Sequence, residues 1–172
     1  MNVLWLSEIT SEDINKIGNK AFRLSELYQL KLPVPQGFVI TSNVFKKFLE
    51  NNNLSKQINS LLLGIDINNF KFLKAKVNEI NEIIMKAEFP ERLKNEIYEA
   101  YDHLSINEDV WRKANKTALD LIRTGRSLPY IAVRLSLISK ESENTSFLNV
   151  KGISSLITVL KKCFSHLFSF DN

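Results

Sequence analysis

The stretch Ile17–Thr41 constrains the fold of this chain more than any other part of its sequence. Apolar residues recur at helical spacing over Ala21–Leu30, and Pro33 ends the pattern because the residue before a proline is pushed out of the α region. Val34–Gly37 has the composition of a turn, and Phe38–Thr41 is a short apolar run typical of a buried strand. The stretch therefore predicts a loop, a helix, a proline-bounded turn and a strand.

Gly18, Asn19 and Lys20 lie where this loop becomes the helix. The first backbone N–H groups of a helix have no partner inside the helix, and the helix dipole places partial positive charge at the same end. A lysine beside such an end provides a grip for a phosphate group. The simpler alternative is a glycine turn followed by a surface lysine.

Length and charge exclude several classes of protein. The 172 residues suffice for a sizeable core, and we interpret residues 1–172 as a single domain. The net charge of +4 is modest, and lysines are interspersed with glutamates rather than gathered in a basic stripe, which argues against a nucleic-acid partner. No apolar run approaches the roughly 20 residues of a membrane span, and the first residues lack the basic flank of a signal peptide. The sequence thus predicts a cytoplasmic protein with no membrane partner.

The cysteine and the two histidines suggest structural roles. The single Cys163 cannot form an internal disulfide, which suits a reducing compartment, and its place in an apolar helical pattern predicts a buried, unreactive thiol. His103 lies beside the apolar face of one predicted helix, and His166 lies on the polar side of another. We interpret neither histidine as a catalytic base or a metal ligand.

The segment 44–104 is interpreted as a helical insertion. Ser42 is expected to cap its first helix, and Ser55–Leu63 forms the second, with Gly64 at its end. Two amphipathic helices follow and meet at Pro90, which suits the first position of the later one. Because they are joined so tightly, we expect them to form an antiparallel hairpin. The predicted inward residues of the segment are Ile58, Leu61, Leu62, Phe70, Leu73, Val77, Ile80, Ile84, Ala87, Leu93, Ile97, Ala100 and Leu104.

A second strong strand is predicted at Tyr130–Ile138, after a helix over residues 108–124 that ends at Gly125. This strand carries Arg134, and a guanidinium rarely stays buried without a partner. In one interpretation, Arg134 points to the sheet edge and meets a surface carboxylate. In the other, it reaches into a cleft and grips phosphate oxygens in the forked geometry that arginine offers.

The remaining segments complete the predicted fold. A polar loop, a short strand and an amphipathic last helix are predicted at Ser139–Ser146, Phe147–Val150 and Ile153–Phe168. The fold class is α/β, or mainly helical α+β, with one small sheet flanked by helices. The strands of this sheet are predicted at Val3–Leu6, Phe38–Thr41, Tyr130–Ile138 and Phe147–Val150.

Several sequence motifs of the chain, taken in order, resemble the start of phosphoenolpyruvate synthase. The same domain also occurs in pyruvate phosphate dikinase and rifampicin phosphotransferase. The motifs are VLWL, IGNKAFRLSEL, LPVPQGFVIT, AY-x-x-LS, IAVRLS, FLNVKG and LKKCFSHLFS. The resemblance covers the whole chain. It implies an ATP-grasp nucleotide-binding domain, of which this chain is the incomplete N-terminal portion.

The resemblance also implies roles for individual residues. In that family the lysine of the first motif and the arginine of the strand motif contact the ATP phosphates, and these correspond to Lys20 and Arg134. Gly18, Asn19 and Ser136 belong to the same motifs and are implied as further phosphate contacts. The implied cofactors are ATP and Mg²⁺. Complete members convert pyruvate, ATP and water to phosphoenolpyruvate, AMP and phosphate, with a phosphohistidine on a separate domain carrying the phosphoryl group.

The chain departs from the family pattern at three places. Arg134–Glu141 reads RLSLISKE where the family has RSSATAED, the family's AGQ segment is missing beside Phe147, and Asn19 replaces a glycine. A flexible lid over phosphates needs glycine, because glycine alone freely reaches positive φ. The family's metal-binding carboxylates, second lobe, phosphohistidine domain and pyruvate barrel have no counterpart here. We therefore expect no turnover by this chain alone.

Two hypotheses follow from these observations. In the first, the chain is a truncated or split piece of a phosphoenolpyruvate synthase-type phosphotransferase that binds ATP weakly. Its partners would be the remaining domains of a split enzyme or a second copy of itself. In the second, it is a degenerate, non-catalytic relative that acts as a protein-interaction module and binds no nucleotide.

Overall fold

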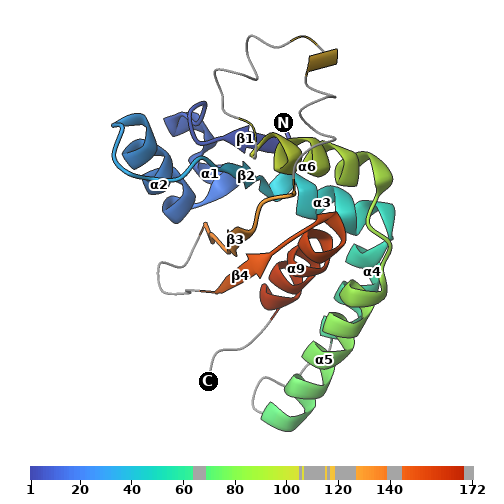
Figure 1. Ribbon diagram of the computed structural model, residues 1–172. Coiled ribbons are helices and arrows are strands. Elements are labelled where there is room, and N and C mark those ends of the chain that lie inside the picture. The colour runs from blue at the N-terminus through green and yellow to red at the C-terminus, as the bar shows by residue number, and fades with distance from the viewer. Residues whose placement is uncertain are drawn as a thin grey trace.

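The residues that the structure describes form two small antiparallel sheets with helices packed around them (Figure 1). The computed structural model describes residues 1–63, 69–104, 106, 115, 117–118, 127–138 and 145–168. Most of these residues are helical, which agrees with the predicted mainly helical α/β class. The predicted helix over 108–124, Gly64, Gly125 and most of the loop that follows Ile138 lie outside the described residues.

The first sheet pairs β1 (Val3–Trp5) with β2 (Phe38–Ile40), so that Val3 lies opposite Ile40. Between these strands the chain forms three short helical segments: η1 (Ser11–Asp13), α1 (Ile14–Ile17) and α2 (Asn19–Gln29). The predicted helix and strand are confirmed in this order, and the residues between them contain neither helix nor strand. The helix α2 ends at Gln29, and Lys31 takes a left-handed conformation with φ of 59°.

Four longer helices follow: α3 (Ser42–Asn51), α4 (Leu54–Leu62), α5 (Phe70–Lys86) and α6 (Glu91–His103). The cap of α3 is Thr41 rather than the predicted Ser42, which is the first residue of the helix. The Thr41 hydroxyl donates to the Met1 carbonyl oxygen at 3.1 Å, so it holds the start of the chain rather than the helix end.

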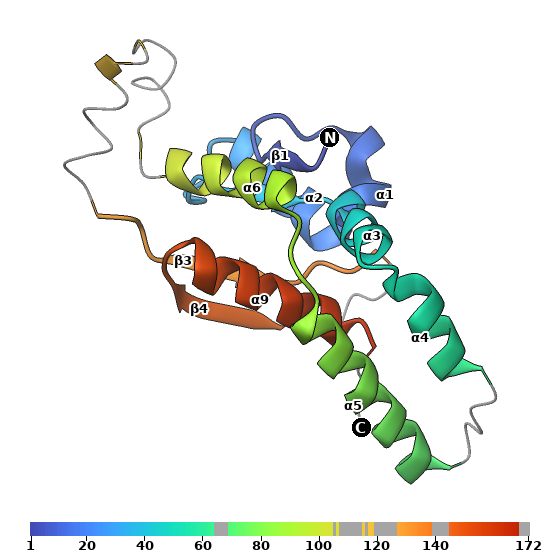
Figure 2. The same cartoon turned by 90° about the vertical axis from the view of Figure 1, so that its right-hand side faces the viewer.

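The prediction that α5 and α6 form an antiparallel hairpin is wrong. The helix α5 packs against α4 and α9 instead, and Figure 2 shows α5 and α6 running in different directions from their short connection. The cause is extended backbone at Ala87 and Pro90, with ψ of 143° and 127°, which redirects the chain without reversing it. The Lys161 ammonium holds this bend by donating to the carbonyl oxygens of Met85 and Ala87 at the end of α5.

The second sheet pairs β3 (Ile131–Arg134) with β4 (Ser146–Val150), and α9 (Ile153–His166) packs against β4. The prediction of one sheet with four strands is therefore wrong, because the strands form two separate pairs. The first sheet carries core side chains on both faces, and the second lies against α9, so helices rather than shared strands connect the two sheets.

Two hydrophobic cores meet at the first sheet. The small core holds Leu4, Leu6, Ile9, Ile17 and Ala21. The large core gathers the buried faces of α3, α4, α5, α6 and α9, and the alternate strand residues Val3, Phe38 and Ile40 pack against it. Period-2 alternation thus sends neighbouring side chains of one strand into different cores.

Two residues predicted to point inward are exposed. Leu62 is 42% exposed and Phe70 is 55% exposed, and both lie at the far end of the pair formed by α4 and α5 (Figure 2). Periodicity places them on the correct helical face, but that face extends beyond the helices that cover it. Among the residues described, no helix combines the length and apolarity that crossing a membrane requires.

Candidate functional site

Gly18 forms the corner between α1 and α2. Its backbone has φ of 79° and ψ of 163°, a conformation that is essentially restricted to glycine. The Gly18 N–H donates to the Ile14 carbonyl oxygen at 2.9 Å, and the Gly18 carbonyl oxygen accepts from Phe22 N–H at 3.1 Å. The residue therefore ends one helix and starts the next, and it fixes the direction of the N-terminus of α2.

The chain beyond β3 meets this corner directly. The hydroxyl oxygen of Ser136 accepts a hydrogen bond from the Ala21 backbone N–H at 3.2 Å, across 115 residues of sequence. A Cβ atom on Gly18 would lie 2.6 Å from the Leu137 carbonyl oxygen and 2.7 Å from Ser136 Oγ. Ser136 thus caps α2 from outside the helix, and only glycine allows the backbone to approach this closely. We call Gly18–Ala21 together with Arg134–Leu137 the α2–β3 junction.

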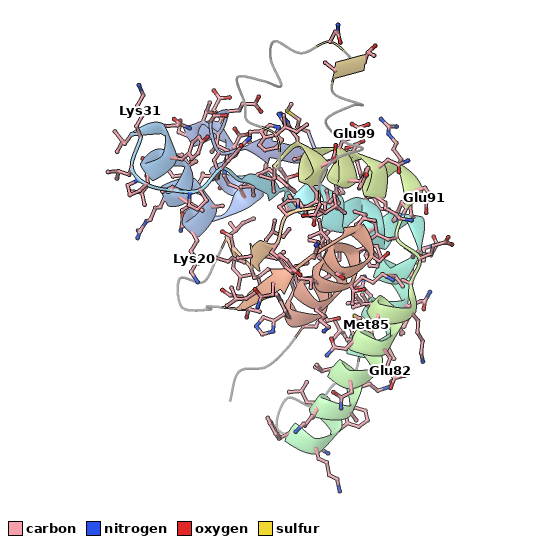
Figure 3. The ribbon with its side chains drawn as sticks, in the orientation of Figure 1. Lys20, Lys31, Glu82, Met85, Glu91 and Glu99 are labelled. Atoms are coloured by element: carbon pink, nitrogen blue, oxygen red, sulfur yellow. The ribbon has the colours of Figure 1, made fainter. Side chains whose placement is uncertain are left out.

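Both predicted cations belong to this junction. Lys20 lies in the first turn of α2 and is partly exposed, and Figure 3 shows its side chain pointing toward the side of the molecule where β3 and β4 lie. Arg134 is the last residue of β3 and is exposed, on the face opposite Val133, which packs against the large core. Two residues of extended chain span about 6.6 Å, so the Arg134 backbone lies close to Ser136.

The five predicted site residues are therefore brought to one region. The contacts that join its two sides run through Gly18, Ala21, Ser136 and Leu137. Lys20 precedes Ala21 in the chain, Arg134 lies two residues before Ser136, and Asn19 is the first residue of α2. A helix N-terminus, two cations and a hydroxyl are together suited to binding an anion with several oxygens.

Comparison with known proteins identifies the family. Residues 14–171 match the family described as pyruvate phosphate dikinase, AMP/ATP-binding domain. The chain belongs to this family. It is 34% identical over 176 residues to the probable phosphoenolpyruvate synthase of Archaeoglobus fulgidus and 32% identical over 178 residues to the phosphoenolpyruvate synthase of Aquifex aeolicus. A similar protein of Methanocaldococcus jannaschii, also a probable phosphoenolpyruvate synthase, is 31% identical over 169 residues.

The matched regions cover nearly all of this chain and a small part of each relative. They include 98%, 97% and 97% of the chain but only 21%, 19% and 13% of the Archaeoglobus, Aquifex and Methanocaldococcus proteins. The chain therefore spans about a fifth or less of the length of these curated relatives. The family assignment therefore applies to the part of each longer protein that matches this chain.

The two histidines and Cys163 each pack against other parts of the fold. The His166 Nε2 atom and the Thr145 hydroxyl are 2.8 Å apart and form a hydrogen bond that joins the last residue of α9 to the residue before β4. The His103 ring packs edge-on against Trp5 with 4.6 Å between centroids. Cys163 is buried in the large core, and burial raises the pKa of its thiol to about 11, so the thiol stays neutral near pH 7.

The predicted site residues do not line the hollow beside β1 and α6. Within the described part of the chain, no three His, Cys, Asp or Glu side chains gather as a metal site would require. A hollow of about 580 Å³ opens beside β1 and α6 and is lined by residues such as Trp5, Glu96 and Glu99. The residues of the α2–β3 junction do not line this hollow, so the junction and the hollow are separate features.

Sequence reasoning named five residues of the junction as candidates but did not predict the contacts that join its two sides. The Ser136 hydroxyl was predicted as a phosphate contact, and the structure shows it accepting a hydrogen bond from the Ala21 N–H at the start of α2. Tyr101 was not singled out. The sequence pattern could have pointed to Tyr101, because this residue falls one turn after Ile97 on the apolar face of α6. A phenol buried on that face requires a hydrogen-bond partner.

Proposed function

We propose that this chain supplies part of the ATP-binding site of a phosphoenolpyruvate synthase-like phosphotransferase, and that the α2–β3 junction binds the phosphates. Lys20 and Arg134 contact the phosphate oxygens, and Gly18, Asn19 and Ser136 shape the site around them. The observation that supports this most is the hydrogen bond from Ala21 N–H to Ser136 Oγ, because it holds the two motifs against each other. Family membership supports ATP as the nucleotide.

Each residue type contributes differently to phosphate binding. Lysine offers a compact charge, and arginine offers a planar fork that matches two phosphate oxygens. The N-terminus of α2 adds partial positive charge. Ser136 accepts from Ala21 through a lone pair, which leaves its O–H proton to donate to a phosphate oxygen. Phosphoryl transfer depends mainly on positioning and charge neutralisation, and these are the functions that the junction provides.

The wider architecture is proposed on the same basis. The chain is the N-terminal portion of an ATP-grasp-type domain, and residues 44–104 are its helical insertion. Mg²⁺ would neutralise phosphate charge in the complete site, but no metal cluster occurs among the described residues, so no step here depends on it. Conversion of pyruvate, ATP and water to phosphoenolpyruvate, AMP and phosphate requires parts beyond this chain, and we expect the chain alone to bind ATP without turnover.

Isothermal titration of the chain with ATP tests this proposal. Lys20→Ala and Arg134→Ala should each weaken ATP binding by about 10- to 100-fold, because a hydrogen bond to a charged group contributes roughly 1.5–3 kcal/mol. Arg134→Lys should restore only part of the affinity, since an ammonium cannot bind two oxygens in the forked geometry. The double variant should deviate from additivity, because both cations contact one ligand.

Matched controls come from exposed cations elsewhere. Lys46 lies on α3, and the side chain of Arg92 on α6 is 91% exposed. Lys46→Ala and Arg92→Ala should leave ATP affinity within twofold of the unaltered chain. Equal affinities for Lys20→Ala and Lys46→Ala would overturn the proposal. Complete absence of ATP binding would also overturn it and would favour a non-catalytic interaction module.

A further inference from the structure

The Tyr101 hydroxyl connects three parts of the chain at the end of the second sheet. Tyr101 lies on α6 and is completely buried. Its hydroxyl donates to the Pro129 carbonyl oxygen at 2.7 Å and accepts from the Gly152 backbone N–H at 2.9 Å. One phenol oxygen therefore joins a helix to the segment before β3 and to the corner between β4 and α9.

Pro129 and Gly152, the two hydrogen-bond partners of Tyr101, lie where the pairing of β3 with β4 would continue. Ile131 pairs with Val150, so two residues further along the same register Pro129 would lie opposite Gly152. The Tyr101 hydroxyl bridges these two residues, accepting from the N–H of one and donating to the carbonyl of the other. It takes the place of the next hydrogen bond of the ladder. A slip of β3 against β4 would separate Pro129 from Gly152, so the Tyr101 hydroxyl would lose at least one of its two hydrogen bonds.

The register needs such a constraint because the pairing changes along the strands. Val133 pairs with Phe147 and Arg134 with Ser146, which is offset by one residue from the pairing of Ile131 with Val150. Asn149 has φ of 57° within this irregularity. A one-residue shift in register would reverse the faces of the strand, and Arg134 would then point toward the large core.

We propose that Tyr101 is a positioning residue for the phosphate site, which fixes the register of β3 and thereby holds Arg134 and Ser136 against the N-terminus of α2. This proposal rests on the proposed function for its effect on ATP, but the register constraint itself does not. The hydroxyl acts at the start of β3, and the α2–β3 junction lies at its end. Tyr101 does not touch the phosphates.

The test compares Tyr101→Phe with Tyr98→Phe, since Tyr98 is on the same helix and 41% exposed. Tyr101→Phe should speed hydrogen exchange of the Gly152 amide by about 10-fold, because the amide loses its acceptor. It should also weaken ATP binding by about 10-fold while the far-ultraviolet circular dichroism spectrum stays that of a folded chain. Tyr98→Phe should change neither quantity.

The outcomes separate this proposal from the proposed function. If the unaltered chain binds no ATP, the proposed function fails, and the exchange rate of the Gly152 amide still decides whether Tyr101 constrains the register. An unchanged exchange rate in Tyr101→Phe overturns the proposal. So does unchanged ATP affinity in a folded Tyr101→Phe chain when Lys20→Ala has lost it.

A measurement on the unaltered chain covers the case in which Tyr101→Phe does not fold. Because coupling between two sites is reciprocal, saturating ATP should slow exchange of the Gly152 amide more than exchange of amides within α5. Equal slowing of both would show only general stabilisation of the fold and would overturn the proposal.

Discussion

The large core and the α2–β3 junction are built in opposite ways. The large core joins helix faces through many interchangeable apolar contacts, and Phe48, with 0% exposure, packs against the rings of Phe89 and Phe164 at centroid distances of 5.6 and 5.3 Å. The junction is joined, among the described residues, by the hydrogen bond from Ala21 N–H to Ser136 Oγ and by the close approach of Gly18 to the Leu137 carbonyl. Stability of the fold therefore comes mainly from the first region, and geometry of the candidate site from the second.

This difference shows what kinds of substitution each region tolerates. A core responds to lost volume in proportion to the atoms removed, and similar apolar side chains can replace one another. A close backbone approach responds to a single added atom. The predictions below test this contrast in order of decreasing expected effect.

Phe48→Ala should lower the free energy of unfolding by about 3–5 kcal/mol, because it removes a fully buried ring from the large core. Phe70→Ala is the matched control, since Phe70 is 55% exposed and its loss should cost no more than about 0.5 kcal/mol. Urea unfolding followed by circular dichroism measures both. Similar losses for the two variants would contradict the assignment of the large core.

Gly18→Ala should be more destabilising than Gly152→Ala, although the two glycines share nearly the same backbone conformation, with φ of 79° and 81°. Alanine at either position bears the backbone strain, about 1–3 kcal/mol. Only at Gly18 does the new methyl group also collide with the Leu137 carbonyl, because nothing lies within 4 Å of it at Gly152. The difference in unfolding free energy isolates the collision, and equal losses would show that the junction is not closely packed.

Stability should fall at high pH because of Cys163 in the large core. Burial raises its pKa from 9.0 to about 11, so the thiol is neutral in the folded chain while the unfolded chain ionises earlier. The stabilisation is complete below about pH 9 and is lost as pH rises toward 11, by at most about 2–3 kcal/mol. Urea unfolding of the unaltered chain and of Cys163→Ala across this range measures it. The decline should be smaller in the variant.

Ser136→Ala should have the smallest effect on stability, about 1 kcal/mol, because it removes one hydrogen bond to Ala21 N–H at the start of α2. Its effect on ATP affinity should be larger than its effect on stability suggests, since the same hydroxyl is proposed to donate to a phosphate. Ser136→Thr keeps the hydroxyl and serves as the comparison. Thermal unfolding and ATP titration of the two variants separate capping from binding.

The sequence predicts where the helices and strands of this fold lie better than it predicts which of them pack together. Helical periodicity correctly identified the buried residues Leu73, Val77, Ile80 and Ile84 of α5, because a repeat of apolar side chains is a local property. Pairing between helices is not local. The extended backbone at Ala87 and Pro90 turned the expected hairpin of α5 and α6 into two divergent helices, and no periodicity records that bend.

The same limit applies to sheets and to the site. An apolar run predicts a strand but does not specify which edge it pairs with, so four correctly located strands were joined into one sheet instead of two. For the site, residue types named Lys20 and Arg134 as candidates. The hydrogen bond between Ala21 and Ser136 depends on how distant segments pack, which single-residue chemistry does not determine.

The hydrogen bond between Ala21 and Ser136 also affects when the candidate site forms during synthesis. A ribosome delivers α2 well before it delivers Ser136, because 115 positions separate the two residues. While the chain is being translated, water must satisfy the Ala21 N–H group in place of the serine. The N-terminal end of α2 therefore reaches its final environment only after Ser136 has left the exit tunnel, which is after the helices α3 to α6 have left it.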